Sequence, residues 1–468
     1  MKSPLRFAVV LSCAAAILSA APVDDTLALG RKALANDGVA TASRLAHEAL
    51  TEAPTSAAAH EFAGEVLFRR GDFDPAEAEF RAALKIDPNF AWAWWGLSRL
   101  ADCMSLHKTA LLDIRQAYEL NRRDLRIFRD WALHLEGQQH IDALQKYAAA
   151  LDPIRDADEL AALREHIQFD QAVNGRDVLR LASPYQQTEV LIDALVENRI
   201  RAYGVDVSIN GHPVKLVLDT GASGILLSHA GAAAAGLTRL ATATIRGFGN
   251  NTRPTGGFRG LAEHVRIGPL EYRDAIVNVA DRDIPDVEDG LIGADVFSDF
   301  LVTIDFAARR LLLKPFPNYR PGDTDPYDAA VTRETRGFTR VYRFGHMLLL
   351  PARVSGSREV HFVLDTGAAR TLISYDLAEE VSKLKTDGRT GLQGLSGKVA
   401  DVYQTGDLML EFAGFSQRNL GMTSIDLWEQ SRRLGTEISG FLGLPVLSLF
   451  RLTLDYRDGL VKFERPTP

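Results

Sequence analysis

Two stretches of the sequence, VLDTGASGILLS at residues 217–228 and VLDTGAARTLIS at residues 363–374, share eight of their twelve positions. Each begins with apolar residues that lead into Asp-Thr-Gly, a pattern typical of a buried strand followed by a tight turn. A single Asp-Thr-Gly sequence can arise by chance, and it is then most simply explained as a turn on the protein surface. Two copies in matching contexts predict a duplicated structural unit, with one aspartate at the same place in each copy.

The sequence around each turn repeats as well. YGVDVSI, an Asn-Gly pair at 210–211 and HPVKLVLD predict a β-hairpin that leads into the first turn. Each half later carries two apolar residues and a glycine, LIG at 291–293 and FLG at 441–443, before a short predicted helix and a strand hairpin. A break rich in proline, aspartate and arginine, PFPNYRPGDTDPYD at 315–328, divides the two halves.

Residues 200–315 and 335–466 each resemble one lobe of an aspartic protease of the pepsin/retropepsin clan. The short lobes, the sequence Asp-Thr-Gly-Ala and the lack of disulfides are more similar to retropepsin units, here two in tandem. In that family two lobes pack about a pseudo-twofold axis, and their Asp-Thr-Gly turns meet at the bottom of a cleft. The resemblance implies an all-β bilobal aspartic-protease fold, with a first lobe at 185–315, a linker at 316–334 and a second lobe at 335–466.

Asp219 and Asp365 would be the catalytic pair of such an enzyme. Two carboxyl groups a few ångströms apart cannot both ionise easily, so they share one proton. The ionised partner takes a proton from a water held between them, and the neutral partner hydrogen-bonds the scissile carbonyl as it becomes tetrahedral. Either aspartate fits the role of the base at this stage.

Four neighbouring residues would support the pair. The resemblance implies that Thr220 and Thr366 hydrogen-bond across the interface between the lobes and fix the two turns. Gly221 and Gly367 let the backbone approach the carboxyl groups closely, because they carry no side chain. The apolar residues of the LIG and FLG segments are expected to run through the two turns and to pack them.

The sequence departs from the family pattern at two pairs of positions. Ala222 and Ala368 stand where pepsin-type enzymes often have a hydroxyl residue. Fewer hydrogen bonds to the dyad leave it less acidic, which predicts a mildly acidic optimum. Ala294 and Leu444 stand where retropepsins often have arginine, so the ion pair made there in the family is in doubt.

Each half also contains a glycine-rich segment, IRGFGNNTRPTGGFRG at 245–260 and TGLQGLSGKV at 390–399. These segments are candidate flaps that close over an extended peptide, which such a cleft binds through strand-like main-chain hydrogen bonds. A plain β-turn explains the same composition equally well, and both interpretations stay open. The candidate flap residues are Gly247, Phe248, Gly249, Gly394 and Leu395.

Other polar residues near the turns have simpler explanations. His229 follows the first Asp strand and is predicted to lie on the surface, since the dyad needs no histidine. Asp295 fits a helix start and Asp305 a strand turn. No cluster of cysteines and histidines has metal-ligand spacing, and the 11 histidines are scattered, so the sequence predicts no cofactor and no metal.

The part of the chain before the duplicated unit is rich in alanine and has a register of 34 residues. Gly30, Gly64 and Ser98 share one phase of this register. The copy AGEVLFRRGDFDPAEAEFRAALKIDP at 63–88 resembles the tetratricopeptide repeat, in which small residues let two antiparallel helices approach and a proline ends the second helix. We expect an all-α tetratricopeptide-type solenoid over 24–170, with a plain helical bundle as the alternative. Two further phases are occupied by alanines at 42, 76 and 110 and at 49, 83 and 117.

Solenoids of this kind present a concave surface to a peptide or protein, so a protein partner on the helical repeats is expected. Trp92, Trp94 and Trp95 either line that surface or belong to the core, and at least one of them is predicted to be core. The formal net charge of −8 across 468 residues shows no basic excess, so no nucleic-acid partner is predicted.

The first residues have the order of a secretory signal. Lys2 and Arg6 precede an apolar run, and small residues follow before an acidic stretch, which predicts a signal peptide at 1–21. The run is too short to span a bilayer comfortably, so no membrane span is expected after its removal. We expect a periplasmic or secreted protein, with lipoprotein anchoring at Cys13 as an alternative. Cys103 would then be the one cysteine left, and it cannot form an intramolecular disulfide.

These patterns favour an aspartic endopeptidase that acts on an extended polypeptide and uses helical repeats to recruit a substrate or partner. The alternative is a peptide- or protein-binding module that keeps a pepsin-like body without catalysis. In a third arrangement the lobes pair between two chains. A linker of this length favours pairing within one chain, because closing the linker costs less free energy than recruiting a second chain at low concentration.

Overall fold

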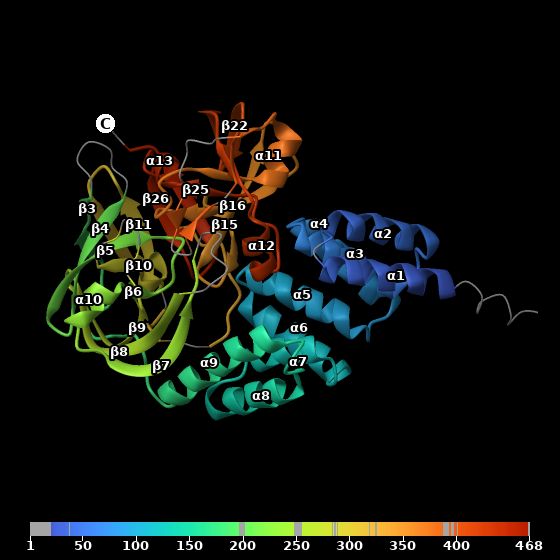
Figure 1. Cartoon of the computed structure of the whole chain (residues 1–468), viewed down its shortest axis with the longest axis horizontal. Coiled ribbons are helices and arrows are strands. Elements are labelled where there is room, and N and C mark those ends of the chain that lie inside the picture. The colour runs from blue at the N-terminus through green and yellow to red at the C-terminus, as the bar shows by residue number, and fades with distance from the viewer. Residues whose placement is uncertain are drawn as a thin grey trace, which may run out of the picture.

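The computed structural model describes residues 20–36, 38–195, 202–247, 255–282, 284, 287, 289–317, 319–322, 325–386, 393–394, 397–399 and 401–466. Within these residues helices come first and strands follow, as Figure 1 shows. The predicted multidomain fold class, an all-α solenoid followed by an all-β bilobal part, is confirmed. Residues 1–19, which include Cys13 and most of the predicted signal peptide, lie outside the described residues.

The described part of the N-terminal region forms nine helices. Sequential helices pack as neighbours, with the closest pairs formed by the first and second, third and fourth, and fifth and sixth helices. No helix in the described part of the chain is both long and apolar enough to cross a membrane. The helices are α1 Ala20–Ala35, α2 Val39–Glu52, α3 Ala57–Arg69, α4 Phe73–Ile86, α5 Ala91–Cys103, α6 His107–Leu120, α7 Leu125–Ala132, α8 Gly137–Ala150 and α9 Ala157–Val173.

The 34-residue register has a direct packing cause. Each glycine leaves space for a phenylalanine ring of another helix. A Cβ on Gly30 of α1 would lie 2.5 Å from the Phe62 ring of α3, and a Cβ on Gly64 of α3 would lie 2.7 Å from the Phe80 ring of α4. The six alanines of the other two phases lie in α2, α4 and α6 and are fully buried. Small residues therefore recur because the paired helices cross there at close range.

Phe80 carries much of this packing, and its truncation is expected to destabilise the repeats strongly. The side chain is fully buried and its ring contacts both Gly64 and Gly96. Phe80→Ala should lower the free energy of unfolding by about 3–5 kcal/mol, because the cavity cannot refill without moving helices. Urea unfolding followed by tryptophan fluorescence reports on it. Leu29→Ala, at a side chain that is 59% exposed on α1, is the control and should change stability by less than about 0.5 kcal/mol; equal effects would contradict this packing account.

One of the three clustered tryptophans is a core residue, as predicted. Trp95 is buried, and its indole N–H donates to Asp130 Oδ2 at 2.6 Å. Trp92 and Trp94 are partly buried, and their indole N–H groups donate to Asp124 Oδ2 and to the Pro88 carbonyl. The three rings are thus fixed by hydrogen bonds within the helical domain.

The first lobe is built on one large sheet. Its strands follow the order β1-β9-β6-β10-β5-β4-β8-β7, and β3 pairs with β4. The predicted hairpin is present, with Asn210 and Gly211 at φ 50° and 88° as the turn between β4 and β5. The elements are β1 Arg180–Leu181, β3 Asp193–Ala194, β4 Tyr203–Ile209, β5 His212–Asp219, β6 Ile225–Leu227, α10 His229–Ala233, β7 Thr238–Ile245, β8 Thr255–Ile267, β9 Leu270–Ala280, β10 Gly290–Gly293 and η1 Ala294–Phe297.

The second lobe repeats the plan of the first. Its main sheet has the order β18-β21-β24-β17-β25-β16-β15-β22-β23, β14 pairs with β15, and β19 and β20 form a separate small ladder. The elements are β14 Tyr342–Phe344, β15 Met347–Val354, β16 Val360–Asp365, β17 Leu372–Ser374, α11 Tyr375–Val381, β18 Lys385–Thr386, β19 Gln393–Gly394, β20 Gly397–Lys398, β21 Val402–Gln404, β22 Asp407–Phe412, β23 Phe415–Leu420, β24 Thr423–Ile425, α12 Trp428–Leu434, β25 Gly440–Gly443 and α13 Leu444–Leu447.

A third sheet joins the two lobes within one chain. Strands β11 of the first lobe and β26 of the second pair antiparallel, with Thr303 opposite Thr453 and their hydroxyl oxygens 3.0 Å apart. This equivalence of the two threonines is what a pseudo-twofold axis through the sheet requires. The two lobes thus pair within one chain in this structure. The strands are β2 Thr188–Leu191, β11 Phe300–Asp305, β12 Arg310–Pro315, β13 Thr339–Arg340, β26 Arg451–Asp455 and β27 Leu460–Glu464.

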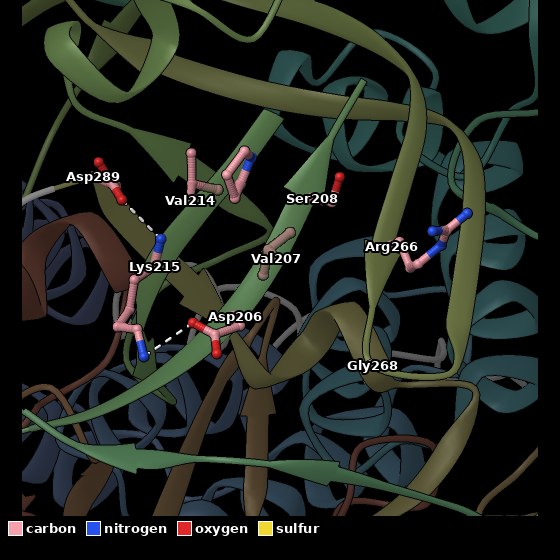
Figure 2. A pocket seen from close by; sticks show the side chains of 9 residues that line it. Asp206, Val207, Ser208, Val214, Lys215, Arg266, Gly268 and Asp289 are labelled. Carbon is pink, nitrogen blue, oxygen red and sulfur yellow. Dashed lines mark hydrogen bonds and ion pairs between the residues drawn. The ribbon is translucent and has the colours of Figure 1, made fainter. Parts of the chain in front are cut away.

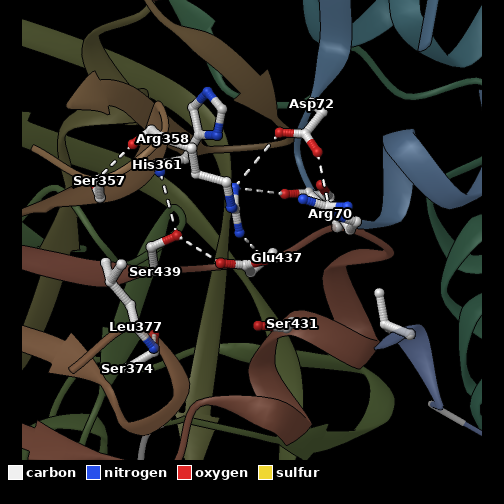
Figure 3. Close-up of polar contacts among 12 residues, drawn as sticks. Arg70, Asp72, Ser357, Arg358, His361, Ser374, Leu377, Ser431, Glu437 and Ser439 are labelled. Carbon is white, nitrogen blue, oxygen red and sulfur yellow. Dashed lines mark hydrogen bonds and ion pairs between the residues drawn. The ribbon is translucent and has the colours of Figure 1, made fainter. Parts of the chain in front are cut away.

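The helical domain docks firmly on the second lobe through the turn between α3 and α4 (Figure 3). Arg358 of the lobe bonds Glu437 at 2.6 Å and lies 3.6 Å from Asp72 of the helical domain. Beneath this cluster, Phe73 packs on Tyr342 with ring centroids 4.2 Å apart, and His361 is buried next to both rings. Burial, and then Arg358, lowers the pKa of His361 to about 3, so this histidine is neutral.

The same domain also touches the first lobe and the linker. Glu165 on α9 accepts hydrogen bonds from the backbone N–H and the hydroxyl of Thr244 on β7. In the linker, Asp328 accepts from the hydroxyl of Thr109 at the start of α6. The repeats are therefore packed against both lobes and the linker, through contacts of α3, α4, α5, α6 and α9.

Candidate active site

Each Asp-Thr-Gly turn sits at the end of a strand that is held by a parallel neighbour. In the first lobe β10 lies between β5 and β6, and Asp219 is opposite Gly293. In the second lobe β25 lies between β16 and β17, and Asp365 is opposite Gly443. The LIG and FLG segments thus run through the two turns as expected, and Ile292 and Leu442 are buried there.

Two threonines bind the turns to each other across the lobe interface. The Thr220 hydroxyl donates to the Leu364 carbonyl at 2.8 Å, and the Thr366 hydroxyl donates to the Leu218 carbonyl at 2.8 Å. Each hydroxyl oxygen in turn accepts the backbone N–H of the other threonine at 3.0 Å. Both side chains are buried, so the predicted cross-lobe hydrogen bonds are present and fully satisfied.

The two glycines are placed against the carboxyl group of the opposite lobe. A Cβ on Gly367 would lie 2.5 Å from Asp219 Cγ, and a Cβ on Gly221 would lie 2.9 Å from Asp365 Cγ. Any side chain at these positions would displace a carboxyl group. Glycine is required here for close approach rather than for backbone conformation.

The two carboxyl groups are hydrogen-bonded to each other and are surrounded by protein, although each aspartate stays partly exposed. Desolvation raises the pKa of Asp365 well above its ordinary value, and the neighbouring Asp219 charge raises it further. Desolvation also raises the pKa of Asp219, but the Gly221 N–H, the Asp365 hydrogen bond and His346 oppose that rise. The pair therefore holds one proton most readily on Asp365.

The backbone supplies further hydrogen bonds to the pair. Asp219 Oδ1 accepts from the Gly221 N–H at 2.8 Å, and Asp365 Oδ1 accepts from the N–H groups of Gly367 and Ala368 at 2.9 Å each. Ala222 and Ala368 bring no hydroxyl to either carboxyl group, so these contacts are made by the main chain.

His346 is a neighbour of the pair that the sequence did not single out. It lies in the turn between β14 and β15 of the second lobe, and its Nε2 is 3.2 Å from the Gly221 carbonyl of the first lobe. A carbonyl can only accept, so Nε2 carries the hydrogen. Nothing in the sequence separates this histidine from the other ten, because its partner lies 125 positions away in the chain.

The remaining predicted residues have structural places. His229 is exposed at the start of α10. Asp295 lies in the first turn of the helix η1, as expected, and it also accepts from the Ser223 hydroxyl at 2.8 Å and the Gly224 N–H at 2.9 Å, which holds the first Asp-Thr-Gly turn. Asp305 accepts from the Ala308 N–H in a strand turn, as expected.

The candidate flaps are described in part. Gly247 follows the end of β7, and β7 pairs with β8, so the first segment joins the strands of a hairpin. Gly394 ends β19, which pairs with β20. Phe248, Gly249 and Leu395 lie outside the described residues.

Figure 2 shows a pocket on the first lobe, formed where strands β4 and β5 lie beside Arg266, Gly268 and Asp289. The Lys215 ammonium at this pocket is already paired, because its Nζ lies 3.0 Å from Asp206 Oδ1. The Lys215 backbone N–H also donates to Asp289 at 2.7 Å. None of the residues that line the pocket belongs to the two Asp-Thr-Gly turns. The chemistry of the dyad is therefore separate from it.

The expectation that the histidines are scattered is wrong for one pair. His140 on α8 and His166 on α9 lie with ring centroids 5.9 Å apart, and Asp170 lies one helical turn beyond His166. The three offer ligand atoms within 4.8 Å of one another. The i,i+4 spacing of His166 and Asp170 was visible in the sequence, whereas the approach of α8 depends on tertiary packing.

Comparisons with known proteins agree with the two lobes. Residues 205–299 match the family model of the gag-polyprotein aspartyl protease, and residues 350–446 match the aspartyl protease family model. Among curated proteins none matches the chain.

Two solved structures are similar to parts of the chain. A mutant O-GlcNAc transferase of Thermobaculum terrenum matches at 18% identity and TM-score 0.26, over 28% of this chain and 26% of its own. PilF of Pseudomonas aeruginosa matches at 19% identity and TM-score 0.28, over 33% of this chain and 70% of its own. This chain thus spans about a quarter of the length of the transferase, and scores of this size do not establish a shared fold.

The family matches and the paired Asp-Thr-Gly turns cover the same two segments. Behind an N-terminal array of helical repeats, the chain carries two tandem domains that are each similar to an aspartyl protease.

Proposed function

We propose that the chain is an aspartic endopeptidase that hydrolyses peptide bonds with a water activated between Asp219 and Asp365. The observation that carries this proposal is the hydrogen-bonded carboxyl pair, contributed by one turn of each lobe and fixed by Thr220 and Thr366. A binding module has no need for two carboxyl groups forced together at a cost in desolvation.

We infer the two catalytic roles from the asymmetry of the pair. Asp219, ionised, takes a proton from the water as its oxygen attacks the peptide carbonyl carbon. Asp365, protonated, donates its proton to the carbonyl oxygen, and a tetrahedral diol forms. The diol collapses when the C–N bond breaks, the amine nitrogen takes the proton held by Asp219, and a diol hydroxyl returns a proton to Asp365. The reaction consumes one water and needs no cofactor.

The substrate side follows from the same architecture. A polypeptide in extended conformation fits a cleft between two sheets, where main-chain hydrogen bonds continue the strand pattern. The helical repeats, which are packed on both lobes, would recruit a substrate or a protein partner. A periplasmic or secreted location is part of the proposal and rests on the composition of residues 1–21.

The pH profile tests the shared proton. The rate should fall as pH drops through the lower pKa of the pair, because Asp219 then becomes protonated and loses its role as base. It should fall again as pH rises through the upper pKa, because Asp365 then loses the proton it donates. Both pKa values are raised, so the optimum should be mildly acidic and above the ordinary Asp value of about 3.9.

The measurement is cleavage of a denatured protein or mixed-peptide substrate from about pH 3 to pH 8. This range covers the expected fall in rate on both the acidic and the basic side of the optimum. A bell-shaped profile in the mildly acidic range supports the proposal. An optimum far below the ordinary Asp pKa would contradict the raised pair. Absence of cleavage throughout would favour the binding-module alternative.

A further inference from the structure

Three side chains of the helical domain direct ligand atoms at one point. His140 Nε2 on α8 and His166 Nε2 on α9 each lie 3.4 Å from Asp170 Oδ2, and all three atoms are within 4.8 Å of one another. These side chains play no part in the proposed catalysis. They are placed where the last two helices of the repeats face each other.

The two distances to Asp170 Oδ2 fit shared coordination better than hydrogen bonding. In a tetrahedral site with metal–ligand bonds of about 2.0–2.1 Å, neighbouring ligand atoms lie about 3.3 Å apart. A good N–H···O hydrogen bond is shorter, at about 2.9 Å. Asp170 Oδ2 is buried and accepts no hydrogen bond from any residue in the described part of the chain. An unsatisfied buried carboxylate oxygen between two imidazoles calls for a cation.

The first imidazole is already held in the form that binds a metal. His140 Nδ1 lies 2.8 Å from the Ala132 carbonyl, which can only accept, so Nδ1 carries the hydrogen and Nε2 keeps its lone pair. The side chains of His140 and Asp170 are 15% and 17% exposed, whereas His166 is 43% exposed. The site is thus anchored on its inner side and open on its outer side, where a water ligand fits.

The charges around the cluster are mixed. Arg259 on β8 faces Asp170 and Glu165, and its guanidinium is held over the Phe169 ring at 4.4 Å. Asp170 and Glu165 together exceed the charge of Arg259, so a divalent cation does not meet a net positive surface.

We propose that His140, His166 and Asp170 form a binding site for a divalent transition-metal ion of the Zn²⁺ type, with water as the fourth ligand. Two imidazoles and one carboxylate suit Zn²⁺, whereas Mg²⁺ and Ca²⁺ take oxygen ligands. The ion would tie α8 to α9. Since α9 is bonded to β7 through Glu165 and Thr244, the site would also fix the repeats against the first lobe.

Metal binding to the full chain tests the site directly. After treatment with a chelator, the wild type should take up one Zn²⁺ per chain in equilibrium dialysis, and Co²⁺ should give the visible absorption of a tetrahedral ion. His166→Gln and Asp170→Asn should each weaken Zn²⁺ binding by at least about 10-fold. Zn²⁺ should raise the Tm of the wild type and leave that of His166→Gln unchanged.

His47→Gln is the matched control, because His47 is exposed on α2, remote from the cluster in the chain; it should bind Zn²⁺ as the wild type does. Asp365→Asn should also bind normally, so failure of the proposed protease function leaves this result standing. The proposal is overturned if the wild type binds no Zn²⁺, or if the His166 and Asp170 variants bind it as tightly as the wild type. His166 is partly exposed, so its replacement leaves the fold intact for the comparison.

Discussion

Asp219→Asn and Asp365→Asn are each expected to reduce peptide cleavage by about 10³-fold or more. Asparagine keeps the shape of the side chain but holds neither the negative charge needed on Asp219 nor the proton needed on Asp365. The two losses should be equally severe although they lie in different lobes, because one water requires both groups. Initial rates on a denatured-protein substrate at the optimum pH measure them.

Asp206→Asn is the control for these variants. Asp206 lies on β4 of the first lobe, 77% exposed, in an ion pair with Lys215 at the surface. Its replacement makes the same chemical change outside the dyad and should leave the rate unchanged. An account with a single catalytic carboxyl would be supported instead if only one of the two dyad variants lost activity.

Thr366→Val should both destabilise the paired lobes and impair cleavage. Valine has the shape of threonine but removes the hydroxyl that donates to the Leu218 carbonyl and accepts from the Thr220 N–H. The Leu218 carbonyl and the Thr220 N–H then stay buried without this hydrogen bond, which lowers the free energy of unfolding by about 1–3 kcal/mol for each group. The turns also lose the contact that aligns the carboxyl groups, and a displacement near 1 Å costs about 10²-fold in rate.

Thr366→Ser restores the hydroxyl and is expected to recover most of the stability and activity. Thr220→Val should behave like Thr366→Val, because the two residues make equivalent bonds. The double valine variant should lose less than the sum of the two, since each single change already breaks part of the shared network. Equal stability and rate for the valine and serine variants would show that the hydroxyl groups are dispensable.

The parts of the fold that repeat were readable from the sequence. The Asp-Thr-Gly turns, the LIG and FLG segments and the 34-residue register all recur, and a recurrence points to a shared structural cause. Gly64 and Gly367 illustrate it: each is small because a ring or a carboxyl group of another element occupies the space a side chain would fill.

The features that depend on contacts between distant elements could not be predicted from the sequence. His346 reaches the Gly221 carbonyl only because the lobes pair, and the dyad becomes asymmetric only in that setting. His140 meets His166 and Asp170 only once α8 packs on α9. The docking of Arg358 on Asp72 and Glu437 joins residues with no common pattern (Figure 3).

The central claim is that two aspartates of one chain form one active site with one shared proton. The most direct measurement mixes Asp219→Asn and Asp365→Asn in equal amounts and assays peptide cleavage at the optimum pH beside each variant alone and the wild type. We predict activity for the wild type and none for either variant or for their mixture, because each chain holds only one intact carboxyl. Recovery of activity in the mixture would contradict the claim, since it would place the active site between two chains.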